Sequence, residues 1–237
     1  MNIEKNIDIY GDQDPRRIPN YTAAEASKYL RLSVSTLRSW AKGRGYTYQD
    51  VYTFSGPIMG KSREGIESLL SFENIIEAHI IKSLRTIHGV SMKKLKVALD
   101  TAENKFGINN LLLSPNMRAA AGQLFLEQYG QLINLSLSGQ YAMKKIFEAH
   151  LRRVEYDIDG LPMRFYPFLK PDSDDSKKSI VINPFVSFGK PTVANRNIST
   201  YVIVNRIDAG EDINDVADDY DLDIQDVEDA IIYERAA

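Results

Sequence analysis

Residues 21–42 read YTAAEASKYLRLSVSTLRSWAK, and this segment is the most informative about the fold of the N-terminal part of the chain. Thr22 and Glu25 have the spacing of a capping box, which predicts the start of a short helix. After a brief turn, Ser33 is suited to cap a second helix over 34–42, whose apolar residues share one face. Two short helices joined by a tight turn predict a helix-turn-helix unit.

The segments that follow predict a wing and a helical core. Residues 46–61 are rich in Tyr, Thr, Val and Phe and contain turn-forming glycines, which is typical of a short hairpin. Ser71 and Ser91 are each suited to cap a long amphipathic helix. His79 falls on the apolar stripe of the first of these helices, so we interpret it as a core histidine.

The middle of the chain is less regular. Residues 107–137 change to β-type patterns, residues 140–151 are typical of one helix, and two apolar segments joined by Asp159 and Gly160 predict a hairpin. Residues 171–179 read PDSDDSKKS, a composition typical of a linker. We therefore expect a small central α+β segment followed by a linker.

The C-terminal part predicts a second helical unit. Residues 180–182 and 192–193 can pair as a small β-ribbon, and three helices follow, the last two joined by a short turn at 220–222. The expected fold is mainly α with small β elements (α+β). The expected domains are a winged helix-turn-helix with two long helices (1–106), a central α+β segment (107–170), a linker (171–179) and a three-helix, helix-turn-helix-like domain with a β-ribbon (180–237).

The charge of the chain is divided between its ends. The net charge is −3, but residues 1–100 hold 15 Lys and Arg against 11 Asp and Glu, whereas residues 181–237 hold 4 against 12. A phosphate duplex attracts the first helix-turn-helix and repels the second. The two ends are therefore expected to bind different partners.

The candidate DNA contacts lie on the basic unit. A recognition helix enters the major groove with short donors and cations near its N-terminus. Arginine can bind guanine bidentately or grip phosphate, while serine and lysine mostly position the backbone. The expected DNA-binding residues are Ser35, Thr36, Arg38, Ser39, Lys42, Arg44 and Lys61.

This N-terminal unit resembles the winged helix-turn-helix of MerR-like regulators, on residues 21–27 and 32–40. In that family Thr-Leu-Arg positions open the recognition helix, so the resemblance implies that Arg38 is the principal DNA contact. Ser35 and Ser39 stand where the family often has a larger basic residue and a tyrosine. Because the chain has no cysteine, a metal-sensing MerR protein is not expected.

The C-terminal part contains five short motifs in a fixed order: Ile182-Asn183-Pro184, Phe188-Gly189-Lys190-Pro191, Ile198-Ser199-Thr200, Ala209-Gly210-Glu211 and Asp218-Asp219-Tyr220. On these motifs it resembles a second family, the short domain of unknown function numbered 433, which is common in prokaryotic antitoxins. An N-terminal winged helix joined to this domain is similar to VapB-type antitoxins. That resemblance implies an antitoxin that represses its own operon through operator double-stranded DNA and neutralises a PIN-domain ribonuclease toxin.

The acidic end fits a partner other than DNA. The last helix is expected to present Gln225, Asp226, Glu228 and Asp229, where a recognition helix needs cations. These residues are expected to contact the toxin or a second copy of the chain, since operator binding by such modules usually uses a homodimer. Two alternatives remain: a MerR-like regulator without a toxin, and an interaction scaffold that never binds DNA.

Other classes of function find little support. Without cysteine, disulfides, zinc fingers and thiol catalysis are excluded. No histidine has ligand spacing to another, and no Rossmann, phosphate-loop or Gly-x-Ser-x-Gly pattern occurs. We expect no catalytic residues, metal or cofactor. No run of about 18 apolar residues predicts a membrane span, and residues 1–9 do not resemble a signal peptide, so the expected location is the cytoplasm.

Overall fold

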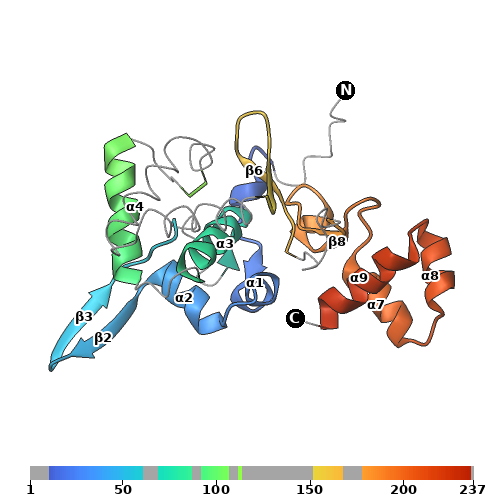
Figure 1. The fold of residues 1–237 in the computed structure, drawn as a ribbon, viewed down its shortest axis with the longest axis horizontal. Helices are drawn as coiled ribbons and strands as arrows, with labels where there is room; N and C mark the ends of the chain where they lie inside the picture. Colours follow the sequence, from blue (N-terminus) through green and yellow to red (C-terminus); the bar gives the residue numbers. More distant parts are fainter. Residues whose placement is uncertain are drawn as a thin grey trace, which may run out of the picture.

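The computed structural model describes residues 11–60, 69–86, 92–106, 112–113, 152–167 and 178–235. These residues form helices and small two-stranded antiparallel sheets (Figure 1), which confirms the expected mainly α, α+β fold. Figure 1 shows the wing at one end of the molecule and the C-terminal helices at the other.

The helix-turn-helix forms as its caps predict. Helix α1 spans Ala23–Leu30 and helix α2 spans Val34–Lys42. The Thr22 hydroxyl accepts from the Glu25 backbone N–H (3.1 Å), and the Glu25 carboxylate accepts from the Thr22 N–H (2.8 Å). This reciprocal pair satisfies two donors that the first turn of a helix leaves unpaired.

A central helix carries the core beneath this unit. Helix α3 (Phe72–Thr86) buries most of its length, and helix α4 (Met92–Phe106) packs against it. Strand β1 (Tyr21–Thr22) pairs with β4 (Leu69–Leu70), and both strands contact α1. The largest side chains that these elements bury fully are Tyr21, Leu37, Phe72, Ile75, Ile76, Ile80, Ile81 and Leu84.

The wing is a two-stranded ribbon. Strand β2 (Arg44–Tyr48) pairs with β3 (Val51–Ser55) in antiparallel register. The two-residue turn between them, Gln49 and Asp50, has φ angles of 49° and 61°. Positive φ at both central positions defines a type I′ turn, whose twist matches that of the paired strands. The predicted hairpin is therefore present, displaced slightly toward the N-terminus.

A second hairpin contacts both helix α3 and the start of the C-terminal domain. Strand β5 (Val154–Tyr156) pairs with β6 (Pro162–Phe165), as the sequence predicts. The backbones of Phe165 and Ile182 exchange two hydrogen bonds of 2.9 and 2.8 Å. His79 is 3 % exposed, and its ring lies 4.8 Å from that of Phe165, which confirms it as a core histidine.

The C-terminal domain consists of a ribbon and three helices. Strand β7 (Ile180–Val181) pairs with β8 (Thr192–Val193). Helices α7 (Thr200–Asp208), α8 (Ile213–Tyr220) and α9 (Ile224–Arg235) follow. The backbone at Asp221 is left-handed and makes the tight turn from α8 to α9. Two single-turn 3₁₀ helices, η1 (Pro15–Arg17) and η3 (Ser187–Gly189), lie outside these elements.

Several of the sequence predictions concern residues that the structure does not describe. The β patterns expected over 107–137, apart from 112–113, and the helix expected over 140–151 lie outside the described residues, as does most of the expected linker. The domain boundaries at 106, 170 and 179 stay predictions. At the end of the expected linker Ser179 is buried, and its hydroxyl donates to Asp229.

Candidate nucleic-acid interface

Helix α2 presents the predicted basic residues on its outer face. Ser35, Arg38 and Lys42 are exposed, whereas Leu37 and Trp40 on the opposite face are 0 % and 3 % exposed. Burial of the apolar face sets how the helix lies on the core, so its outer side chains face solvent. The arrangement leaves a helix available for a groove of duplex DNA.

The other predicted contacts divide into three groups. Arg44, at the start of the wing, is exposed, while Thr36 and Ser39 are half-buried. Lys61 lies outside the described residues. The Ser33 hydroxyl accepts from the Thr36 backbone N–H (3.2 Å) and lies 3.0 Å from the hydroxyl of Ser35. The start of α2 is thus ordered by its own hydroxyl groups before any ligand binds.

The cations of this surface have no carboxylate partners within the described part of the chain. There, neither Arg38 nor Lys42 nor Arg44 takes part in an ion pair. An unpaired cation keeps its full field for an incoming phosphate, because no nearby carboxylate competes for it. The electrostatics of α2 therefore favour a polyanion.

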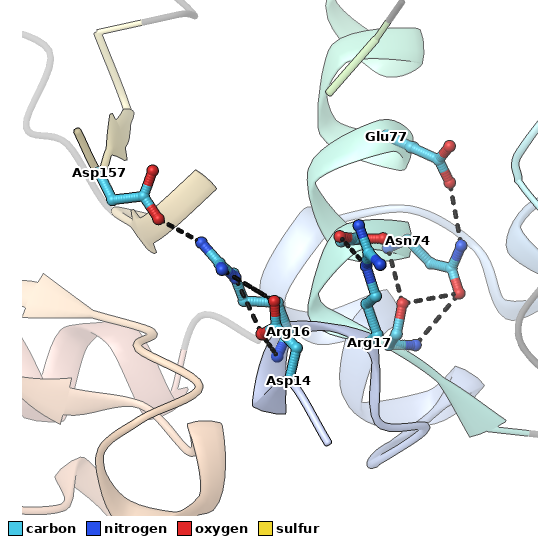
Figure 2. Close-up of polar contacts among 8 residues, drawn as sticks. Asp14, Arg16, Arg17, Asn74, Glu77 and Asp157 are labelled. Carbon is cyan, nitrogen blue, oxygen red and sulfur yellow. Dashed lines mark hydrogen bonds and ion pairs between the residues drawn. The ribbon is translucent and has the colours of Figure 1, made fainter. Parts of the chain in front are cut away.

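The wing is tied to α2 and α3 at its exit. The carbonyl oxygen of Trp40 accepts from the backbone N–H groups of Ile58 (3.0 Å) and Met59 (3.2 Å). The carboxylate of Glu77, only 3 % exposed, accepts from the Gly60 N–H at 3.0 Å. It also accepts from the side-chain amide of Asn74 at 2.9 Å (Figure 2). These contacts fix the base of the wing relative to α2.

The C-terminal domain docks directly on the first helix of the helix-turn-helix. Lys190 forms an ion pair with Glu25, the residue that also caps α1. The side-chain amide of Asn20 donates to the Phe188 carbonyl oxygen at 2.5 Å. Partial burial raises the pKa of Glu25, but hydrogen bonds from Lys190 and Thr22 outweigh it and hold that pKa below its usual value.

The loop that contains Phe188 and Lys190 lies close to the N-terminal core at Gly189. Ser187, Phe188 and Gly189 have successive φ angles of 48°, 52° and 71°. A Cβ added to Gly189 would lie 1.9 Å from the hydroxyl oxygen of Tyr21, which is 1 % exposed. Only a residue without a side chain fits this approach at this φ. Residues 185–190, hereafter the docking loop, thus make close contact with the helix-turn-helix.

A charged cluster supports this contact from the side. The Arg16 guanidinium contacts Asp14 at 2.8 Å and reaches Asp157 of the second hairpin at 2.5 Å (Figure 2). It also lies 5.7 Å from the ring centroid of Phe185 in the docking loop. One arginine thereby connects η1, the hairpin and the docking loop. The pattern of single charges in the sequence does not reveal this long-range cluster.

The acidic end differs from the expectation at two positions. Asp226 and Asp229 are each 1 % exposed, so the expectation that α9 presents them to a partner is wrong. Ser179 donates to Asp229, and Asn195 donates to Asp226 at 2.9 Å. Both carboxylates therefore attach α9 to the residues that flank the β-ribbon, a role typical of buried, hydrogen-bonded charges.

The exposed carboxylates lie mainly on α8 and on the residues just before and after it. Gln225 and Glu228 are exposed on α9, as expected. Arg206 pairs with Asp219 at 2.6 Å and also with Glu211, which neutralises part of the surface. The other exposed carboxylates of this region belong to Asp212, Asp215, Asp218, Asp221 and Asp223. The domain remains an acidic surface and a poor fit for phosphate.

Two sequence families match this chain, one at its basic N-terminal part and one at its acidic C-terminal part. Residues 19–99 match a family described as "Putative DNA-binding HTH domain", and residues 180–233 match "Protein of unknown function (DUF433)". The uncharacterized protein Rv2308 of Mycobacterium tuberculosis is 39 % identical over 222 residues, which cover 91 % of this chain and 90 % of that protein. The chain belongs to the family of Rv2308.

Two further proteins are similar to this chain over most of its length. A protein named "Putative antitoxin VapB45" from Mycobacterium tuberculosis is 28 % identical over 228 residues, covering 90 % of this chain and 93 % of that protein. The crystal structure of Rv2018 from the same organism has a TM-score of 0.67 at 23 % identity, over 90 % of this chain and 98 % of that one. The last comparison shows a shared fold.

These comparisons confirm two resemblances drawn from the sequence. The N-terminal part matches a helix-turn-helix family described as DNA-binding, and the C-terminal part matches the domain numbered 433. Together with the relative's name, they support an antitoxin or DNA-binding role. Among the described residues, no helix combines the length and apolarity that crossing a bilayer requires.

Proposed function

We propose that the protein is the antitoxin of a toxin–antitoxin pair. Its winged helix-turn-helix binds operator DNA and represses its own operon, and its acidic C-terminal domain takes part in neutralising a PIN-domain ribonuclease. The observation that carries the DNA half is the outer face of α2, where Arg38 and Lys42 are exposed above a buried apolar face. Such a helix supplies both groove contacts and phosphate contacts.

The toxin half rests on charge and on the relative's name. A ribonuclease must attract RNA, so a basic groove is expected on it, and an acidic partner can occlude such a groove. The C-terminal domain supplies exposed carboxylates around α8. A relative over nearly the full chain bears the name of an antitoxin. These points together favour a protein inhibitor over an enzyme.

The DNA half is tested by Arg38→Ala against a matched control. We expect the wild-type chain to select a duplex from a randomised pool and bind it with an affinity that falls steeply with salt. Arg38→Ala should weaken binding by about tenfold: loss of a base contact also relaxes the sequence preference, whereas loss of a phosphate contact reduces the salt slope by about one. Arg85→Ala removes the same charge from an exposed position at the end of α3 and should change none of these.

The toxin half is tested with the protein encoded by the adjacent reading frame. We expect that protein to cleave RNA when purified alone and to lose this activity when the present chain is added in equimolar amounts. Ribonuclease activity that persists at excess of this chain would reject the antitoxin assignment. DNA binding without such a neighbour would instead favour a transcriptional regulator that has no toxin.

A further inference from the structure

The wing exposes four large apolar side chains to solvent. Tyr52 is 71 % exposed, Val51 63 %, Phe54 58 % and Tyr46 45 %. A two-stranded hairpin is marginally stable by itself, and large exposed aromatic side chains usually mark a surface that another molecule covers. The ribbon stands clear of the body of the molecule (Figure 1).

The register places two of these rings on one face. Thr47 is opposite Tyr52, and Gly45 is opposite Phe54, so all four residues share one side of the ribbon, hereafter the aromatic face. The Tyr52 ring lies over Gly45, since a Cβ added there would be 2.2 Å from the tyrosine hydroxyl oxygen. The absence of a side chain at this position lets the ring lie flat, with its outer surface open to a partner.

The charge of the wing argues against DNA as the occupant. Between residues 44 and 55 there is one cation, Arg44, and one anion, Asp50. Asp50 is exposed in the turn at the tip, where a wing that entered a groove would bring it toward phosphate. The aromatic face itself carries no charge. Phosphate binding depends on cations, and these lie on α2 instead.

The area available matches the centre of a protein interface. A fully buried aromatic residue covers roughly 150–250 Å², so the exposed parts of Tyr52 and Phe54 on the aromatic face together offer about 250 Å². That is about a third of the ~800 Å² that each partner contributes to a standard interface, and the open edges of β2 and β3 adjoin it. A surface of this size and neutrality suits a second ribbon of the same kind.

We propose that the aromatic face of the wing is the surface through which two copies of this chain associate. Across a two-fold axis the same neutral patch meets itself without charge repulsion. The C-terminal domain is a poorer choice for self-association, because residues 181–237 hold 12 acidic against 4 basic residues. A wing-to-wing dimer also places two α2 helices as a symmetric pair, which, if the proposed DNA binding holds, suits a palindromic site.

Sedimentation velocity of the full chain tests this surface. We expect the wild type to sediment as a concentration-dependent dimer, and the double variant Tyr52→Ser with Phe54→Ser to raise the dimer dissociation constant at least about 30-fold, as loss of interface anchors does. Tyr201→Ser is the control, because this tyrosine is 65 % exposed on α7 and lies off the wing. Equal thermal unfolding midpoints establish that the variants are folded.

A charge variant separates the two possible occupants. Thr47→Lys places a cation on the aromatic face, so it should weaken the dimer by like-charge repulsion between copies. If DNA covered this face instead, the same lysine would strengthen duplex binding and leave the dimer unchanged, which would overturn the proposal. A wild-type chain that remains monomeric, or a wing variant that dimerises as tightly as the wild type, would overturn it equally. Failure of all DNA binding with the dimer intact would reject only the proposed function.

Discussion

Gly189→Ala should destabilise the protein more than any comparable glycine substitution in the C-terminal domain. The added Cβ would lie 1.9 Å from the hydroxyl oxygen of Tyr21, whose ring is buried and packs edge-on against Tyr29 with centroids 6.2 Å apart. The ring has no free space to yield, so the docking loop or β1 must move. At φ +71° the alanine also carries backbone strain.

The loss of unfolding free energy has two contributions, the backbone strain and the overlap with Tyr21. A non-glycine residue in the left-handed region costs about 1–2 kcal/mol, and overpacking a buried contact costs about 1–3 kcal/mol more. The matched control is Gly210→Ala, because Gly210 has a φ of +95° but its added Cβ meets no atom within 4 Å. The control therefore carries the strain without the overlap. The free energy of unfolding should fall by about 2–5 kcal/mol for Gly189→Ala and by about 1–2 kcal/mol for the control.

Urea unfolding followed by circular dichroism measures this difference, and thermal unfolding should show a midpoint lower by about 2–4 °C per kcal/mol. Tyr21→Phe in the Gly189→Ala background removes the overlapping oxygen and should recover part of the loss. It should recover nothing in the Gly210→Ala background. Equal destabilisation by the two glycine substitutions would refute the close contact between the docking loop and the helix-turn-helix.

Two further predictions concern buried and bridging carboxylates. Glu77→Gln turns one acceptor of the Gly60 N–H into a donor, so it should cost about 1–3 kcal/mol of unfolding free energy and speed amide exchange at Gly60, measured by hydrogen exchange. Glu25→Gln keeps the helix cap but loses the ion pair with Lys190, and should destabilise by less than about 1 kcal/mol at neutral pH. Because the folded state lowers the pKa of Glu25, its extra stability is present above the ordinary glutamate pKa and is lost as the pH falls, so the two proteins should converge in acid unfolding curves.

The sequence predicts the local parts of this fold well, because local rules determine them. Thr22 and Ser33 are caps whose hydroxyls bond to nearby backbone N–H groups, so the starts of α1 and α2 follow from spacing alone. Exposure of Arg38 and Lys42 follows from the apolar period of the same helix. The basic surface of the candidate site was therefore predictable without knowledge of the tertiary structure.

The buried carboxylates show where such reasoning stops. Asp226 and Asp229 are polar, so a sequence pattern assigns them to the outside of α9, yet each lies beside a buried apolar neighbour, Val227 or Ala230. Their burial depends on distant donors that flank the β-ribbon, such as Ser179, which lies 50 residues before Asp229. Charge alone does not reveal a partner at that separation.

The docking loop changes how the opposite charges of the two ends should be understood. Charge alone suggests two independent modules, one for DNA and one for a protein. However, Lys190 of the acidic domain pairs with Glu25, which is part of the capping box of the first helix of the basic one, and Gly189 contacts Tyr21 of β1, just before that helix. Any partner that moves the docking loop must therefore break contacts at the helix on which α2 packs. If such a partner changes the affinity of α2 for DNA by some factor, reciprocity requires that bound DNA change the affinity for the partner by the same factor.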